Sequence, residues 1–449
     1  MNNCRAFLLC ALVLFPAASR AQFPPDPRMK ADILLIVAHP DDETAIGSYL
    51  AKAVFDDGKR VAIIYCNRGT GGGNSAGTEQ AGALGDIREI EARRAVASFG
   101  ITNVWFLNGR DTPGQDLFQS LQAWRHGAVL EDVVRLVRLT RPEVIVTWLP
   151  GFVAGENHGD HQASAVIAVE AFDCAGDPTV FPAQVTPPRE RGDIANATEG
   201  LRAWQPKKIY FFSDASHEIT AEGPAFDIRE VSPSRKQPYY KIALALHTPH
   251  LTQADVSQPA LEAEKTGDYA PIVAWLGKMH LIFGKSVVPA RAQGDVFEGT
   301  GGGPVPWTRP AGYSPDARSG VSVDLGGPFA FYRDFWRAHG IERLAGIVPP
   351  EIEVAAGSYL FVPLLIRNGT ADSVTVSLTS VLPASWSEAS GSGSYRIAPG
   401  ETLPVQTFVR AGSAKTAAAV PVTWKGAVQG RGALEVTLRA TLVDWALPW

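Results

Sequence analysis

The stretch that most constrains the fold of this chain is 31–43, with the sequence ADILLIVAHPDDE. Five consecutive apolar residues, Ile33–Val37, are typical of a short strand that is buried on both faces, as in parallel sheets. The strand runs directly into His39, Pro40 and two aspartates. Because ligands of open α/β sheets collect at the carboxyl ends of the strands, these side chains are predicted to form a functional site. The structural alternative is a helix start, in which Pro40 begins the first turn and the acids complement the helix dipole.

A second stretch repeats this pattern about a hundred residues later. Residues 143–149 (EVIVTWL) are another strand-like apolar run, and a short loop then leads to NHGDH at 157–161. Two histidines and an aspartate again follow the end of a strand. The two clusters together offer imidazoles and carboxylates for a divalent metal, with a further acid and histidine for proton transfer. Their matching positions in two strand-helix units favour a metal site over a simple helix start.

The two motifs resemble those of a known family. AHPDDE at 38–43 and HGDH at 158–161 are similar to the signatures of the PIG-L, or LmbE-like, metal-dependent deacetylases, which remove acetyl groups from N-acetylglucosamine-containing substrates. The resemblance covers roughly residues 32–213, and Gly159 stands where family members often carry proline. It implies a hydrolase with a Rossmann-like fold.

The resemblance also implies a role for each polar residue of the motifs. A divalent ion, zinc in the first place and Fe²⁺ as an alternative, is expected at three protein ligands with one open position. The implied metal ligands are His39, Asp42 and His161. The implied catalytic residues are Asp41, as the base, His158, which stabilises the oxyanion and protonates the leaving amine, and Asp160, which orients His158.

Two further residues are implied to contact the substrate. Arg88 lies in an R-x-x-E pattern with Glu91, and Asp111 follows an expected strand at 104–107. The structural alternatives are an exposed ion pair on one helix face for Arg88 and a turn residue for Asp111. Glu91 is expected to be structural support.

The remainder of the first part alternates strands with helices. Apolar runs at 61–66 and 207–212 are expected strands, which predicts an α/β fold with a Rossmann-like, mostly parallel sheet and helices on both faces. The glycine-rich segment 67–77 lacks both the lysine of a P-loop and the spacing of a dinucleotide fingerprint. It is therefore interpreted as a wall of the active site.

The composition changes after Pro349 and Pro350 to alternating stretches rich in valine, threonine and serine. Short strands at regular spacing predict an all-β sandwich. The segments LPASW at 382–386 and IAPGE at 397–401 resemble Ig-like modules that are often appended to glycan-active enzymes, which implies an Ig-like sandwich. The chain is accordingly divided into a signal peptide at 1–21, a deacetylase domain at 22–348 and the sandwich at 349–449. Trp386 is interpreted as a core residue of the sandwich, with a sugar-stacking platform as the alternative.

The N-terminus and the charge limit the compartment and the partners. Arg5, an apolar run at 6–14 and small residues at 19–21 are typical of a signal peptide, and the run is too short to span a bilayer. We therefore expect export to the periplasm or the extracellular space, without a membrane span in the mature protein. Cys66 and Cys174 would remain, and their pairing stays open. A net charge of −5 gives no electrostatic case for binding nucleic acid.

The functional prediction is a zinc-dependent deacetylase of N-acetylglucosamine-containing glycans or glycolipids. An amidase that acts on another N-acyl group is the main alternative. A non-catalytic glycan-binding protein would keep the same fold without turnover. A non-heme iron oxygenase also uses two histidines and a carboxylate, but the spare Asp41 and His158 fit hydrolysis better. The oligomeric state stays open.

Overall fold

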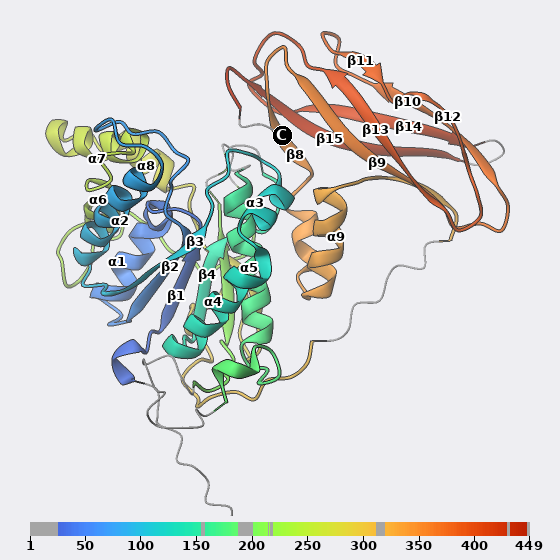
Figure 1. The fold of residues 1–449 in the computed structure, drawn as a ribbon. Helices are drawn as coiled ribbons and strands as arrows, with labels where there is room; N and C mark the ends of the chain where they lie inside the picture. The colour runs from blue at the N-terminus through green and yellow to red at the C-terminus, as the bar shows by residue number, and fades with distance from the viewer. Residues whose placement is uncertain are drawn as a thin grey trace, which may run out of the picture.

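The computed structural model describes residues 26–153, 158–186, 201–213, 215, 219–310, 319–428 and 432–446. The expected signal peptide at 1–21 lies outside these residues. The described chain forms an α/β part and a β-sandwich, which stand side by side in Figure 1. Among the described residues, no helix is both long and apolar enough to cross a bilayer.

A six-stranded sheet forms the centre of the α/β part, in the order β3-β2-β1-β4-β5-β6. The first five strands are parallel, and β6 runs antiparallel to β5 at the edge. The strand order reverses between β1 and β4, and both motifs follow these two strands. The expected parallel sheet is confirmed. Its strands are β1 (Ile33–Val37), β2 (Val61–Asn67), β3 (Asn103–Gly109), β4 (Val144–Trp148), β5 (Lys208–Phe212) and β6 (Ile282–Ser286).

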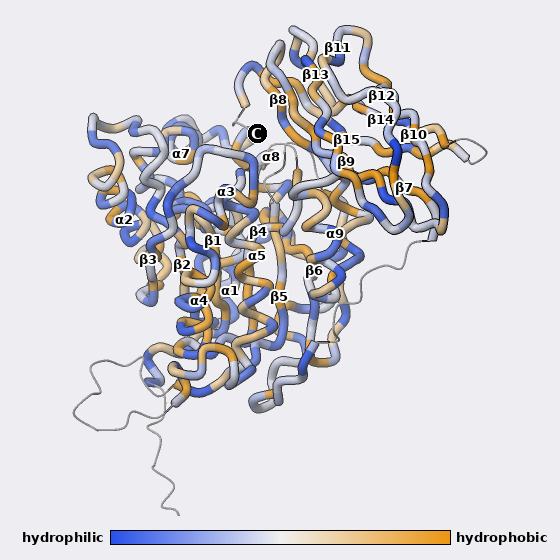
Figure 2. The backbone as a smooth tube through the Cα atoms, turned by 45° about the vertical axis from the view of Figure 1, so that its right-hand side comes forward, coloured by the Kyte–Doolittle hydropathy of each residue, from blue (hydrophilic) through white to orange (hydrophobic). Residues whose placement is uncertain are grey.

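Helices cover both faces of the sheet, because β1 presents apolar side chains to both. Leu34 and Ile36 join one core, and Ile33 and Leu35 join another on the opposite face. Figure 2 shows this apolar interior along the strands. The first core includes α3 (Leu117–Ala123), α4 (His126–Thr140) and α5 (Gly159–Cys174), and the second includes α1 (Gly47–Phe55), α2 (Ala81–Ala97) and α6 (Tyr239–His247).

Shorter elements complete this part of the chain. The chain after β1 first forms a 3-10 helix, η2, which continues directly as α1. Two helices that the sequence did not predict follow α6. The remaining elements are η1 (Pro27–Met29), η2 (Asp42–Ile46), η3 (Pro182–Gln184), α7 (Ala254–Thr266), α8 (Ala270–Leu276), α9 (Pro328–Ala338) and η5 (Glu342–Gly346).

The sandwich consists of a five-stranded sheet, β12-β10-β14-β15-β8, and a four-stranded sheet, β11-β13-β9-β7. All described pairs are antiparallel except β15 with β8. Trp386 is 8% exposed and belongs to the core. The strands are β7 (Val321–Leu325), β8 (Glu351–Ala355), β9 (Tyr359–Asn368), β10 (Val374–Val381), β11 (Ser387–Ser390), β12 (Gly393–Ile397), β13 (Thr402–Arg410), β14 (Val420–Val428) and β15 (Ala433–Val443).

The expected boundary at Pro349 does not separate all strands of the sandwich from the rest of the chain. β7 precedes it and pairs with β9. After β7, α9 packs back on the α/β part, where Trp336 Nε1 donates to the carbonyl of Pro150 at 2.7 Å and Tyr332 to Gln162 at 3.0 Å. One apolar core is therefore continuous through both parts.

Cys66 and Cys174 are both free thiols.

Candidate metal centre and its cavity

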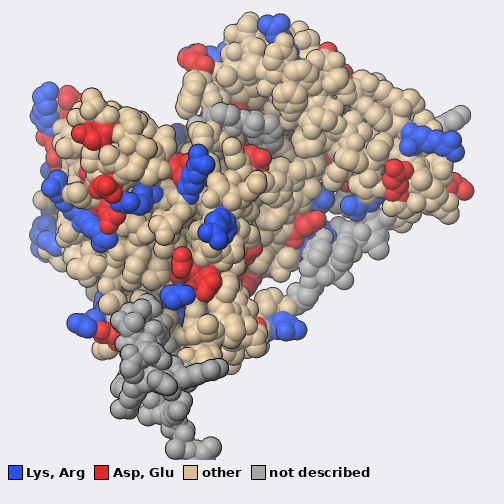
Figure 3. Space-filling model, viewed as in Figure 1, with Lys and Arg blue, Asp and Glu red and all other residues tan. Residues whose placement is uncertain are grey.

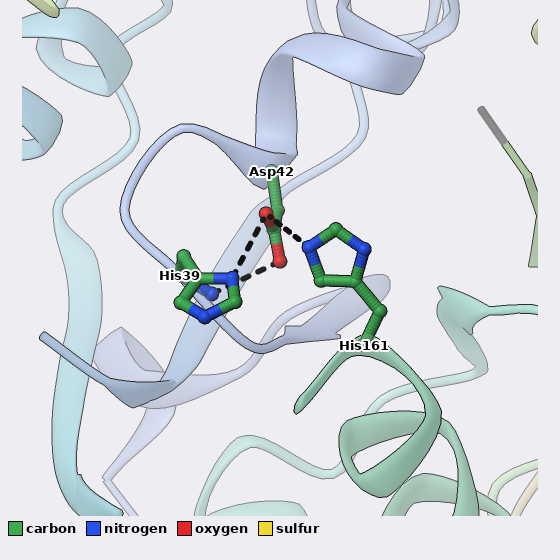
Figure 4. A group of neighbouring side chains, drawn as sticks. All are labelled: His39, Asp42 and His161. Carbon is green, nitrogen blue, oxygen red and sulfur yellow. Dashed lines mark hydrogen bonds and ion pairs between the residues drawn. The ribbon is translucent and has the colours of Figure 1, made fainter. Parts of the chain in front are cut away.

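His39, Asp42 and His161 come together at the point where the strand order reverses (Figure 4). Oδ1 of Asp42 lies 3.7 Å from Nδ1 of His39 and 3.4 Å from Nε2 of His161. One ligand atom from each of the three residues lies within 4.8 Å of the others. His39 follows β1, Asp42 begins η2 and His161 lies in the first turn of α5. Two nitrogens and one oxygen at this spacing suit a catalytic divalent metal.

Asp42 is oriented by three donors. Its Oδ2 accepts hydrogen bonds from the backbone N–H of Ala38 at 2.9 Å, the backbone N–H of His39 at 3.0 Å and Nε1 of Trp148 at 2.8 Å. Oδ1 is left to face the two histidines. Burial alone would raise the pKa of Asp42, but His161 and His39 hold it well below its usual value. Trp148 also stacks on His161, with ring centroids 4.2 Å apart.

The second nitrogen of His39 faces two carboxylates. Its Nε2 lies 3.4 Å from Oδ2 of Asp160 and 3.5 Å from Oδ1 of Asp111. A metal-binding histidine commonly donates its other N–H to a carboxylate, which fixes the ring and its tautomer. Burial lowers the pKa of His39, but the surrounding carboxylates outweigh burial and raise it.

The position of Asp160 corrects one sequence-based expectation. Its carboxylate does not orient His158 but accepts hydrogen bonds from Asn67 at 3.0 Å and from the N–H and hydroxyl of Thr112 at 3.1 and 2.5 Å. The backbone N–H of Asp160 instead donates to Nδ1 of His158 at 3.1 Å. The reason is local: His158 is the N-cap of α5, while the Asp160 side chain turns toward the ends of β2 and β3.

His158 is a neutral hydrogen-bond donor in this arrangement. Burial, and then the positive charges of His39 and His161, lower its pKa to about 3. Because Nδ1 accepts the N–H of Asp160, the proton of the neutral ring is on Nε2. The ring lies next to His39, with centroids 4.7 Å apart, and lines the cavity.

Asp41 lies beside the ligands as the N-cap of η2, with a φ of 131° that non-glycine residues rarely adopt. Burial and the negative charge of Asp42 raise its pKa well above the usual value, against the opposing effects of His250, His39 and Arg88. The side chain lines the cavity. A half-buried carboxylate with a raised pKa next to a candidate metal site has the properties of a general base.

The loop that carries Asp41 is held by residues to which the sequence analysis gave no role. Glu43 is fully buried, and its carboxylate accepts from the hydroxyl of Tyr65 at 2.8 Å and the N–H of Asp41 at 3.1 Å. Its other oxygen lies 2.8 Å from Nε2 of His250. Gln253 donates to the carbonyl of Pro40 at 2.7 Å. The sequence signal that could have found these residues is the short segment HLTQ at 250–253, but its partners are distant in the chain.

Both residues expected to contact the substrate line the cavity. Arg88 is 6% exposed, and its Nη2 donates to the carbonyl of Gly73 at 2.9 Å. A Cβ at Gly69 would lie 2.4 Å from Nη1 of Arg88, so the glycine-rich loop is needed for the guanidinium to fit. Asp111 accepts the N–H of Gly71 at 2.7 Å. Glu91 accepts two hydrogen bonds from Thr252 and is structural, as expected.

The charge of the site also fits a metal. Four aspartates, Asp41, Asp42, Asp111 and Asp160, lie around His39, His158 and His161. Arg88 is the one arginine or lysine among the described residues that line the cavity. A divalent cation would compensate this excess of negative charge. In a second group, made of His39, Asp111 and His158, the ligand atoms also lie within 4.8 Å of one another. The first group is favoured because three donors already orient its carboxylate.

These residues form the floor of a cavity of about 1040 Å³. The glycine-rich loop forms one wall, and α7, α8 and the end of the sandwich form another. Figure 3 shows the surface hollowed between the lobe of α7 and α8 and the sandwich. The volume lies at the upper end of the range for small-molecule sites, so the cavity has room for more than one sugar ring.

Comparison with known proteins gives one family. Residues 34–172 match the family model described as PIG-L: GlcNAc-PI de-N-acetylase. The 1D-myo-inositol 2-acetamido-2-deoxy-alpha-D-glucopyranoside deacetylase 1 of Frankia casuarinae is 31% identical over 166 residues, which are 33% of this chain and 53% of that protein. The deacetylase of Streptomyces scabiei that acts on the same compound is 27% identical over 266 residues, 49% of this chain and 82% of that protein. This chain spans between about half and three fifths of the first few such relatives.

One similar solved structure is the N,N'-diacetylchitobiose deacetylase of Pyrococcus horikoshii. It is 17% identical, and the match covers 57% of this chain and 85% of that chain with a TM-score of 0.36.

Proposed function

Because residues 34–172 match the model of the PIG-L family, we propose that this protein is a metal-dependent hydrolase that removes the acetyl group from N-acetylglucosamine-containing substrates. The observation that carries the proposal is the arrangement of His39, Asp42 and His161 with Asp41 at the floor of one cavity. The relatives named above act on an acetamido sugar by their names, which supports the substrate class.

Zinc is the proposed metal, with Fe²⁺ as the alternative, held by His39, Asp42 and His161. Such an ion lowers the pKa of water and polarises an amide carbonyl. Asp42 is fixed for this role by its three donors, and Nε2 of His39 lies at ion-pair distance from Asp160 and Asp111. The ligand geometry therefore does not depend on the substrate.

Asp41 is proposed to accept a proton from the water that attacks the amide carbon. Its raised pKa makes it a better base than an ordinary carboxylate and then a usable acid. His158 donates its Nε2–H to the oxyanion that develops on the carbonyl. We expected His158 also to protonate the leaving amine, but a neutral ring whose Nδ1 accepts a backbone N–H suits donation of a hydrogen bond alone. Asp41 is therefore proposed to return the proton to the nitrogen as the C–N bond breaks, which releases acetate and an amine.

Arg88 and Asp111 are proposed to bind hydroxyl groups of the sugar. Both line the cavity on the side of the glycine-rich loop. Nη2 of Arg88 donates a hydrogen bond to the carbonyl of Gly73, and its Nε has no partner among the described residues. The remaining donors are available to a ligand, and the charged Asp111 offers a complementary acceptor.

The site of action is proposed to be outside the cytoplasm. This proposal depends on the signal-peptide pattern at 1–21. Export favours a periplasmic or extracellular glycan, oligosaccharide or glycolipid as the substrate. Detection of the mature protein in the periplasm or the medium, with its N-terminus near Gln22, would support the proposal, and an intact N-terminus in the cytoplasm would refute it.

The main experiment is an assay of acetate release by the zinc-loaded protein. N-acetylglucosamine, chito-oligosaccharides and N-acetylglucosaminyl lipids are the substrates, and Asp41→Asn is the control. Acetate release that is lost in the control is the expected result. Release of another acyl group without acetate would instead support the amidase, and binding without release at full metal content would support the non-catalytic alternative.

A further inference from the structure

The cavity extends beyond the metal centre along a wall that is mainly apolar. α7 contributes Asp255, Val256 and Pro259, α8 contributes Ile272 and Trp275, and the end of the sandwich contributes Trp445 and Ala446. Trp275 is 37% exposed and Trp445 is 72% exposed. The two indoles therefore come from different parts of the fold and line the same cavity. Both have apolar surface that a ligand would remove from water.

Trp445 follows a strand that is fixed at its end. Val443, the last residue of β15, pairs with Ala355 of β8, and its carbonyl accepts the N–H of Ala356 at 2.9 Å. The N–H of Leu442 donates to the hydroxyl of Thr416 at 3.0 Å. Trp445 is only two residues beyond this anchor. Its distance from the cavity is thus limited by the position of β15 and β8.

Buried hydrogen bonds connect β8 to the metal centre. The Gln115 side chain is 1% exposed, donates to the carbonyl of Glu353 at 3.0 Å and accepts its N–H at 3.2 Å. Gln162, which follows the ligand His161, donates to the carbonyl of Gln115 at 3.1 Å. Through these contacts the sandwich is held in a defined position relative to the ligands.

We propose that Trp445 and Trp275 are specificity-determining residues that hold an apolar group of the substrate beyond the reacting amide. The inference rests on the proposed function, which places the amino sugar at the polar floor. Apart from Asp255, the wall offers aliphatic carbons and indoles. An indole face can stack on a sugar ring, but the hydroxyls of that ring would find few hydrogen-bond partners on this wall to replace water. An apolar group gains from the same contact, by about fourfold in affinity for each buried methylene.

Two parts of a substrate have this chemistry. One is an alkyl aglycone on the anomeric carbon of the sugar, and the other is an acyl chain longer than acetyl on the nitrogen. The structure indicates only that the group bound at the wall is apolar. The experiment shows whether this group is the aglycone or the acyl chain. The assay compares methyl and octyl β-glycosides of N-acetylglucosamine, the methyl glycoside of N-octanoylglucosamine, and chitotriose.

We expect a higher kcat/KM for either the octyl glycoside or the N-octanoyl compound than for the methyl glycoside of N-acetylglucosamine. A lower KM should account for most of this preference. Trp445→Ala and Trp275→Ala should each reduce this ratio roughly tenfold, as expected for a central aromatic contact. Trp445→Phe should retain most of it. Phe361→Ala is the matched control, because Phe361 is also a half-exposed aromatic residue of the sandwich but does not line the cavity.

An unchanged ratio in both tryptophan variants would overturn the proposal. A preference for chitotriose that both variants lose would also overturn it, because the wall would then bind sugar rings. A binding measurement separates this inference from the proposed function. The ligand is octyl β-glucosaminide, the deacetylated form of the octyl glycoside, and its affinity is measured by equilibrium dialysis. If no substrate releases an acyl group, the proposed function fails, while a tenfold weaker binding in Trp445→Ala but not in Phe361→Ala would still support the apolar site. Equal binding in both would reject it.

Discussion

Oε1 of Glu43 lies 2.8 Å from Nε2 of His250, and both side chains are fully buried. The two residues are 207 positions apart in the chain. Glu43 directly follows Asp42, a proposed metal ligand, and its second oxygen accepts the N–H of Asp41. Burial lowers the pKa of His250, but the charge of Glu43 outweighs burial and raises it. This ion pair therefore fixes the loop that carries both the expected base and one ligand.

Removal of His250 should destabilise the fold and the metal centre together. In His250→Ala the carboxylate of Glu43 would stay buried without its cation, at a cost of about 3–5 kcal/mol in the free energy of unfolding. Denaturant unfolding and a metal titration are the measurements, and metal affinity should fall as well. Lys265→Ala is the control, because Lys265 is 77% exposed and its ion pair with Glu262 should contribute less than about 1 kcal/mol. Equal stability of the two variants would contradict this role of His250.

Asp41→Asn and Asp42→Asn should separate base from ligand. Asp41→Asn is expected to keep the metal and to lower the rate by about 10² to 10⁴, which is the contribution of a general base. Asp42→Asn should lose metal, because a neutral amide replaces a charged ligand that three donors orient. Metal content and rate, measured side by side, test this assignment. If Asp41→Asn were the variant without metal, the two roles would be exchanged.

The same pair should differ in the stability of the metal-free protein. The pKa of Asp41 is raised by folding, so its ionised form is disfavoured in the folded state, and stability falls as the pH rises toward that pKa. Asp41→Asn should therefore raise the melting temperature at neutral pH in the presence of a chelator. The pKa of Asp42 is lowered by folding, so Asp42→Asn should reduce the melting temperature under the same conditions. Calorimetry of both variants provides the test, and a lower melting temperature for Asp41→Asn would count against it.

The pH dependence of kcat/KM should report Asp41. The base acts in its ionised form, so activity should decline as the pH falls through its raised pKa. Asp41→Asn should lack this acidic limb in its residual activity. His158, with a pKa of about 3, stays neutral at all higher pH values and should add no basic limb. A basic limb that disappears in His158→Gln would show that the protonated ring is required.

Gly72→Ala tests the position of Arg88. A Cβ at Gly72 would lie 2.5 Å from Nη2 of Arg88, so the guanidinium must move while the fold remains. Displacement of a substrate-binding group by about 1 Å costs on the order of 10² in kcat/KM, and KM should account for most of the loss. Gly73→Ala is the matched control, because a Cβ there meets nothing within 4 Å. Similar kinetics for both variants would argue against Arg88 as a substrate ligand.

The local sequence determined the central sheet and the grouping of the candidate metal ligands. The apolar run of β1 can be buried only between two layers of helices, and the same holds for β4. Because adjacent parallel strands end at the same edge, His39 and Asp42 after one strand and His161 after the other had to lie close together. Sequence spacing was sufficient for this prediction. Arg88 and Asp111 were predicted at the cavity for a similar reason. Asp111 follows β3, and Arg88 lies in α2, the helix after β2.

The tertiary structure alone decided which groups support those residues. Asp160 lies one position from His161, yet its carboxylate turns to His39, Asn67 and Thr112, which are remote from it in the sequence. β7 joined the sandwich because β9 offered an open edge, which no pattern within β7 records. Local periodicity shows which face of an element is apolar, but not which distant surface will cover it. The contacts of Glu43 with His250, and the place of Trp445 at the cavity, depend on that packing and therefore appear only in three dimensions.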